Sequence, residues 1–112
     1  MHEKELKVVC MRIIYDYLLK KKSAEISYDC LMMLDKEIDY ISFNSPKQAN
    51  ILRQQFYETV ETIERMPTMG AIYKGDMRRI KLGKFRYYIY YRETKAAIEI
   101  LGIWHTSKGT EF

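Results

Sequence analysis

The sequence has few of the residues that break or cross-link a chain. Its 112 residues include only two prolines, five glycines and two cysteines, which excludes a Pro-rich or Gly-rich repeat and a dense disulfide framework. No apolar run approaches the roughly 20 residues that a membrane-spanning helix requires. The opening residues, MHEKE, lack the basic-then-apolar order of a signal peptide. We therefore expect a single cytoplasmic domain without membrane contact, with Cys10 and Cys30 as reduced, buried thiols.

The positive charge is concentrated in the C-terminal part of the chain. The formal net charge is +4, and residues 66–112 contain nine Lys or Arg against four Asp or Glu, whereas residues 1–65 contain ten against eleven. Residues 76–94, DMRRIKLGKFRYYIYYRET, combine six cations with five aromatic residues. An anionic partner is therefore expected to contact the C-terminal part. The competing interpretation is that a modest basic excess only keeps a small domain soluble.

The first part of the chain predicts a helix, a short strand and a second helix. Apolar residues at roughly helical spacing over residues 1–22, ending in three lysines, favour a helical N-terminal extension. Alternating residues over 24–29 predict a short strand. Asp29 then stands at the N-cap position of a helix over residues 30–42, where Leu31, Leu34, Ile38 and Ile41 share one face.

The next helix has the clearest boundaries in the sequence. Ser45 is a good N-cap, and Pro46 at the first helical position gives up an N–H that would have no helical partner. Gln48, three residues after Ser45, completes a capping-box pattern. The helix is expected to end before Pro67, because the residue that precedes a proline avoids helical angles. The short connection between the two helices predicts an antiparallel hairpin.

The C-terminal part changes to a period of two, which is typical of strands. Residues 67–76, with two glycines, are predicted as a loop, and strands are predicted over residues 77–82, 85–92 and 96–104. The last of these is almost entirely apolar and predicts a central strand. The fold class is therefore α+β: a helical hairpin packed on one face of a mainly antiparallel, twisted sheet of about four strands.

Alternation over residues 85–92 assigns the aromatic and basic residues to two faces. One face, predicted to join the core, carries Phe85, Tyr87, Ile89 and Tyr91. The opposite face carries Arg86, Tyr88, Tyr90 and Arg92. The tyrosines of that second face are the better candidates for contact with a partner, and stacking on a nucleobase would contribute about 1–3 kcal/mol for each ring. The alternative is that these rings serve strand packing alone.

Several phrases of the sequence resemble the RelE/ParE superfamily of toxins from type II toxin–antitoxin modules. The resemblance rests on ISYDCLMMLDKEIDYISFNSPKQAN, ERMPTMG, RRIKLGKFRYYIYYRE and IEILGIWH, which follow one another in the order that the family shows. It runs from about residue 24 to residue 108. It therefore divides the chain into an N-terminal extension, residues 1–22, with Met11 as an alternative start, and a toxin domain, residues 23–112.

The resemblance implies a small basic toxin that a cognate acidic antitoxin holds inactive. The antitoxin is expected to fold on binding, with apolar residues across the helical hairpin and carboxylates near the basic strand. Homodimers and toxin–antitoxin hetero-oligomers both fit the sequence. Two targets occur in the superfamily: ParE-like members poison DNA gyrase, and RelE-like members cut messenger RNA on the ribosome. The first helix resembles ParE-like members more closely, so we expect action on gyrase and keep RNA cleavage as the alternative.

If the protein is an enzyme, the resemblance implies a metal-independent endoribonuclease. Its cations would stabilise the charge that builds on the phosphate, and an acid or base would move the protons. The candidate catalytic residues are Arg79, Lys81, Arg86 and His105. The chain departs from the nuclease pattern at Thr106, where a catalytic arginine is typical, and at Phe112, where a functional tyrosine is typical. The structural alternative for His105 is a hydrogen bond to the backbone at a strand end.

A second set of residues is predicted to bind nucleic acid or a protein target. It consists of Lys84, Tyr88, Tyr90, Arg92 and Lys108. The sequence predicts no cofactor and no metal site, and Cys10 and Cys30 show no metal-ligand spacing. A third function stays open at this point, which is a small basic domain that binds nucleic acid or protein without toxic activity.

Overall fold

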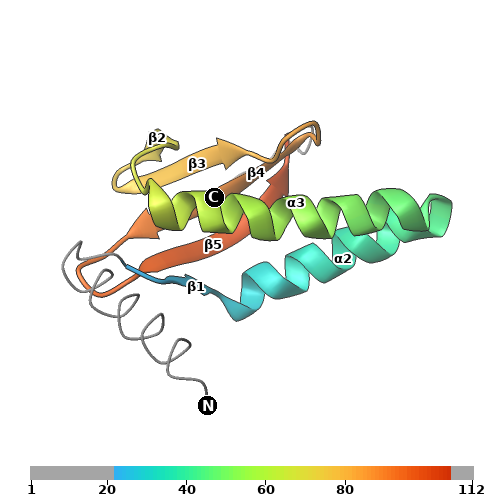
Figure 1. Ribbon diagram of the computed structural model, residues 1–112, viewed down its shortest axis with the longest axis horizontal. Helices are drawn as coiled ribbons and strands as arrows, with labels where there is room; N and C mark the ends of the chain where they lie inside the picture. Colours follow the sequence, from blue (N-terminus) through green and yellow to red (C-terminus); the bar gives the residue numbers. More distant parts are fainter. Residues whose placement is uncertain (1–21, 107–112) are drawn as a thin grey trace, which may run out of the picture.

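The computed structural model describes residues 22–106, and the predicted helix over residues 1–22 lies, except for Lys22, outside this range. The described chain forms two helices and five strands (Figure 1). In chain order these are β1 (Ala24–Ile26), α2 (Tyr28–Asn44), α3 (Pro46–Arg65), β2 (Ala71–Lys74), β3 (Met77–Lys81), β4 (Tyr87–Glu93) and β5 (Ile98–His105). The predicted α+β class is therefore confirmed.

The strands form a single sheet in the order β1-β5-β4-β3-β2. The strand β1 pairs with β5 in parallel, and every other neighbouring pair is antiparallel. The sheet has one strand more than predicted, because residues 67–76 contain β2 and are not a continuous loop. This strand has only four residues, which is too short for a clear alternating pattern. The glycines on both sides of it are typical of a loop, and the segment was therefore predicted as one.

Each of the two helices is capped at its N-terminus by a serine side chain. Asp29 is not the N-cap of α2, which was the predicted role; the Oγ of Ser27 accepts a hydrogen bond from the Cys30 N–H at 3.0 Å and caps the helix two residues earlier. The predicted N-cap of α3 is confirmed, since Ser45 Oγ accepts from the Gln48 N–H at 3.2 Å and Pro46 follows the cap. The Ser45 N–H, which a full capping box would pair with the Gln48 side chain, donates instead to the Ile41 carbonyl at 2.8 Å. Helix α3 also ends where expected, at Arg65.

The core lies between the helical hairpin and one face of the sheet. Figure 1 shows α3 crossing in front of the sheet, with α2 beside it and the tip of the hairpin extending beyond the sheet. Tyr87 and Tyr91 belong to this core, as predicted. The other buried core residues are Cys30, Leu34, Ile38, Ala49, Leu52, Phe56, Val60, Ile63, Leu82, Ile89, Ile98, Ile100 and Ile103. Burial of this apolar surface is the main stabilising term of the fold.

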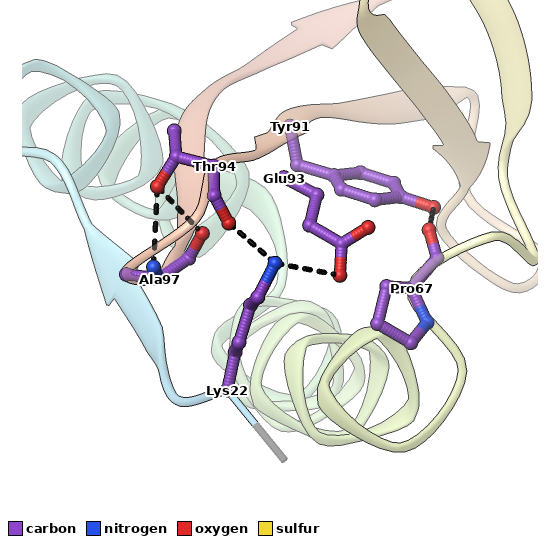
Figure 2. Close-up of polar contacts among 6 residues, drawn as sticks. All are labelled: Lys22, Pro67, Tyr91, Glu93, Thr94 and Ala97. Atoms are coloured by element: carbon purple, nitrogen blue, oxygen red, sulfur yellow. Dashed lines mark hydrogen bonds and ion pairs between the residues drawn. The ribbon is translucent and has the colours of Figure 1, made fainter. Parts of the chain in front are cut away.

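Polar contacts attach the connecting segments to the end of β4 (Figure 2). The hydroxyl of Tyr91 donates to the Pro67 carbonyl and accepts from the Gly70 N–H, both at 2.8 Å, so the ring anchors the α3–β2 connection. The ammonium group of Lys22 forms an ion pair with Glu93 at 3.3 Å and donates to the Thr94 carbonyl. The Lys22 contacts connect the segment that precedes β1 to the turn between β4 and β5.

Candidate target-binding face

The register of the sheet decides which residues share the face opposite the helices, here called the outer face. In β3 and β4, Ile80 lies opposite Ile89 and both side chains pack on the core side. Because neighbouring residues of a strand point to opposite sides, Arg79 and Lys81 project from the outer face. Their partners across the strand pair are Tyr90 and Tyr88, which project from the same face. The register thus brings these two cations and two rings to one side of the sheet.

Arg79 is the centre of an aromatic arrangement on the outer face. Its guanidinium carbon lies 4.4 Å from the centroid of the Tyr88 ring and 5.0 Å from that of the Tyr73 ring. Both distances are within the range of cation–π attraction. Tyr73 was missed by the sequence analysis because it belongs to β2, which was predicted as a loop. Its alternation with Ala71 was the available signal, and two positions are too few to recognise a strand.

Tyr90 does not have the exposure that a contact residue requires. It lies on the expected face, but its exposed fraction is 0%. Its ring packs edge-on against that of Tyr73, with the centroids 5.1 Å apart. Alternation predicts the direction of a side chain and not what covers it, which is why the predicted contact role fails for Tyr90. Tyr88, by contrast, is half-buried and retains some solvent exposure.

Arg92 forms a salt bridge within the sheet. It lies opposite Glu99 on β5, and its guanidinium Nη2 is 3.1 Å from the Glu99 carboxylate oxygen. Such a cross-strand pair stabilises the sheet by about 0.2–1 kcal/mol. The neighbouring Arg78 donates to the carbonyls of Gly70, at 2.8 Å, and Thr68, at 3.3 Å. Both arginines therefore have structural partners, whereas Lys81 is an exposed cation of β3.

The turn between β3 and β4 carries two further candidates, Lys84 and Arg86, and both are exposed. The backbone of Arg86 is fixed, because its carbonyl accepts from the Thr106 N–H at 2.8 Å. Lys84 lines a hollow against α3 together with Phe85 and therefore lies toward the helices. Lys108, the remaining predicted residue, lies outside the described residues.

His105 lies on the opposite side of the sheet from Arg79 and Lys81. It pairs with Tyr87 across β4 and β5, and the two rings meet edge-on with their centroids 4.9 Å apart. Tyr87 belongs to the core, and its hydroxyl donates to Glu37 Oε2 on α2 at 2.8 Å. Burial, followed by the carboxylate of Glu37, raises the pKa of Tyr87. The predicted nuclease set is thus divided: Arg79 and Lys81 share the outer face, and His105 lies on the helix side.

Within residues 22–106, no group of three or more His, Cys, Asp or Glu side chains is arranged to hold a metal ion. Neither helix of that range is long and apolar enough to cross a membrane. The outer face presents the Arg79 guanidinium group next to two phenol rings.

The protein is thus a small basic α+β domain in which a helical hairpin covers one face of a five-stranded sheet and cations lie on β3. The model of the family described as "ParE toxin of type II toxin-antitoxin system, parDE" matches residues 25–109. The match covers most of the chain, so this protein belongs to the ParE toxin family. A solved chain of the chromosomal ParDE TA system from P. aeruginosa has the same fold, with a TM-score of 0.68 at 21% identity over 78% of this chain and 98% of that chain. No curated protein sequence matches this one.

Proposed function

We propose that this type II toxin arrests growth in the cytoplasm by binding DNA gyrase through its outer face. The observation that carries the proposal is the position of Arg79, held between Tyr73 and Tyr88 beside the exposed cation Lys81. Arginine and tyrosine are enriched among the residues that dominate the affinity of protein interfaces. Tyrosine buries a large area with few rotatable bonds, and the two rings restrict the longer side chain of Arg79. Inhibition by surface contact requires no acid or base at the interface.

The geometry supports gyrase over RNA as the target. Cleavage of RNA at a ribose 2′-OH requires a base, an acid and cations around one phosphate. His105 was the acid–base candidate, and the sheet separates it from Arg79 and Lys81. Action as a metal-independent endoribonuclease on ribosome-bound messenger RNA remains the second candidate function. It is favoured by the cation–ring pair of Arg79 and Tyr88, which suits a phosphate next to a stacked base.

A supercoiling assay tests the proposal directly. Purified gyrase is titrated with the wild-type toxin and with the double variant Arg79→Ala with Lys81→Ala. We expect inhibition by the wild type and loss of inhibition by the double variant. A second double variant, Lys36→Ala with Lys47→Ala, removes two exposed cations from the helices and is expected to inhibit like the wild type.

A transcript assay distinguishes the second candidate. Primer extension on messenger RNA after induction would show new 5′ ends within minutes if the toxin cuts RNA on the ribosome. Such cleavage, together with an unaffected gyrase, would reject the gyrase proposal. Unchanged inhibition by the Arg79–Lys81 double variant would reject the outer face as the binding site while keeping gyrase as the target.

Membership of the ParE family also implies a partner, the antitoxin of the module. We propose that this antitoxin is acidic, since the toxin carries a net charge of +4 and its cations are concentrated in the C-terminal part. An antitoxin can inhibit by covering the outer face or by binding elsewhere and blocking access to the target.

A further inference from the structure

Helix α2 is apolar on two opposite sides. One side is buried against the sheet and α3 through Cys30, Leu34 and Ile38. The other side carries large apolar residues, each with an exposed fraction above one half: Tyr28, Met32, Tyr40 and Phe43. A helix that is apolar on two sides is typical of burial on both of them. The outward side of α2 therefore calls for a partner.

One line of exposed residues on α2 has the spacing of a contact between two helices. Met32, Lys36, Asp39 and Phe43 follow one another at intervals of four, three and four residues, and all four are exposed. Residues that meet along a pair of packed helices alternate in the same way, because the repeat averages about 3.5 residues. We call these four residues the α2 seam. Its two ends are apolar, and its centre holds one cation and one carboxylate.

The α2 seam is complementary to itself in one orientation. A twofold axis at the level between residues 37 and 38 makes two α2 helices antiparallel and places Met32 opposite Phe43 of the partner subunit. The same axis places Lys36 opposite Asp39 of the partner subunit. Symmetry repeats each pair, so one axis forms two apolar contacts and two ion pairs. A parallel arrangement would instead bring each charge opposite a like charge.

The fold leaves room for a second copy at this seam. Figure 1 shows α3 beside α2 and the tip of the hairpin extending beyond the sheet. Within residues 22–106, no element covers the α2 seam, because its four side chains are exposed. The outer face belongs to the other side of the sheet. It therefore stays accessible in the monomer and in the dimer, and variants of the seam should inhibit gyrase like the wild type.

The charges of α2 argue against an acidic partner such as the proposed antitoxin. Within α2, which the structure describes completely, Asp29, Asp35 and Asp39 are exposed and the one cation is Lys36. An acidic helix would meet mainly like charges on this side. A second copy instead supplies an opposite charge to both charged residues of the seam. Asp29 and Asp35 lie at the two edges of the seam, where water and salt screen their repulsion.

We infer that the α2 seam is the interface of a homodimer in which two α2 helices pack antiparallel. Only four residues of each copy lie in the seam. The contact is therefore smaller than the interface of about 1,600 Å² that is standard for stable complexes. We expect a reversible dimer with a dissociation constant in the micromolar range. Such a dimer forms independently of the target of the toxin.

Sedimentation velocity of the full-length toxin in a reducing buffer, from about 1 to about 200 µM, tests this inference. Lys36→Asp and Asp39→Lys each leave like charges opposite one another, and each is expected to weaken dimerisation by about tenfold or more. The double variant Lys36→Asp with Asp39→Lys exchanges the two charges. It is expected to recover the wild-type dissociation constant within about threefold. A loss that came from damage to the fold would not be recovered by a second substitution.

A mixing experiment follows from the same symmetry. The Lys36→Asp protein carries two carboxylates in its seam, and the Asp39→Lys protein carries two ammonium groups. Each is expected to remain monomeric alone at a concentration where their equimolar mixture forms a mixed dimer with opposite charges in register. Native circular dichroism spectra are required of both proteins, and both substitutions are at exposed positions.

Two methionines of equal exposure provide the control for the apolar ends of the seam. Met32 and Met69 both have an exposed fraction of 53%, and Met69 lies outside α2. Met32→Glu is expected to weaken dimerisation by about tenfold or more, and Met69→Glu by less than about twofold. A wild-type toxin that stays monomeric at every concentration would overturn the inference. So would wild-type dimerisation of either single charge variant, or a double variant that does not recover.

Discussion

The guanidinium carbon of Arg79 lies 4.4 Å from the centroid of the Tyr88 ring, on the next strand of the sheet. Tyr73 provides a second ring at 5.0 Å from the other neighbouring strand. Three strands therefore contribute to one cation–ring group. This arrangement restricts the rotamers of a long, flexible side chain and presents its charge in a defined place, which reduces the entropy lost when a partner binds.

Arg79→Ala and Arg79→Lys separate the charge of this residue from its planar shape. Arg79→Ala removes both and is expected to weaken binding to gyrase by about tenfold or more. Arg79→Lys keeps the charge but loses the flat contact with the rings, so an intermediate affinity is expected. Binding is measured by calorimetry with purified gyrase. Urea unfolding provides the stability control, and Arg79→Ala should lower the free energy of unfolding by only about 1 kcal/mol. Equal gyrase affinities for the wild type and both variants would show that Arg79 does not contact the target.

Two variants at the start of α2 distinguish the observed cap from the one that the sequence suggested. Ser27→Ala removes the acceptor for the Cys30 N–H and a donor to the Leu101 carbonyl at 3.2 Å. We expect the free energy of unfolding to fall by about 1–2 kcal/mol. Asp29→Ala removes an exposed carboxylate in the first turn, whose interaction with the helix dipole is worth about 0.5 kcal/mol. Thermal unfolding of both variants checks the order, and a larger loss for Asp29→Ala would contradict the assigned cap.

The difference between Ser27 and Asp29 illustrates what the sequence could and could not predict. The helix α3 has a serine, a proline and a long apolar stripe in one consistent pattern, and both its ends were predicted. At α2 two residues of cap-forming type stand close together, and their choice depends on tertiary contacts. Ser27 is fixed by β5, because its N–H donates to the Ile100 carbonyl at 3.0 Å. Such a contact between distant parts of the chain has no local signal.

The same reasoning applies to the candidate site. The strand register joins the face of Arg79 and Lys81 to that of Tyr88. Alternation alone was sufficient only to place residues on the faces of each separate strand, because the period of two is set by backbone geometry. It was insufficient for Tyr90, whose burial depends on what packs over the sheet. Alternation also could not predict that His105 lies on the opposite side of the sheet from Arg79 and Lys81, because the face of His105 follows from its pairing with Tyr87. Strand pairing is a property of the whole sheet.

Tyr91→Phe tests the anchor of the α3–β2 connection (Figure 2). The variant keeps the ring in the core but leaves the Gly70 N–H and the Pro67 carbonyl without their partner. Because Gly70 is buried, we expect the free energy of unfolding to fall by about 1–3 kcal/mol. Tyr28→Phe, at a ring with an exposed fraction of 74%, is the matched control and should change stability by less than about 0.5 kcal/mol. Urea unfolding measures both, and equal stabilities would exclude a structural role for the Tyr91 hydroxyl.

The buried thiol of Cys30 predicts how stability depends on alkaline pH. Burial raises the pKa of Cys30 from 9.0 to about 12, so between these values the folded protein binds a proton that the unfolded chain releases. Stability is therefore fully present below about pH 9 and falls as the pH rises toward 12, by up to about 1.4 kcal/mol for each pH unit. The raised pKa of Tyr91, caused mainly by burial, adds a loss of the same sign above about pH 10.

Urea unfolding between pH 8 and pH 10 isolates the contribution of the thiol. The comparison is made in a Cys10→Ser background, so that Cys30 is the sole cysteine. Above pH 9 the free energy of unfolding should fall more steeply for the protein with Cys30 than for the Cys30→Ala variant. The comparison uses the slopes of the two pH profiles, so a constant loss of stability from the smaller side chain does not affect it. The same background allows an independent check, since a thiol reagent at pH 8 should label Cys30 only as fast as the fold opens. Parallel pH profiles, together with rapid labelling of the native protein, would mean that the side chain of Cys30 is accessible to solvent and not part of the core.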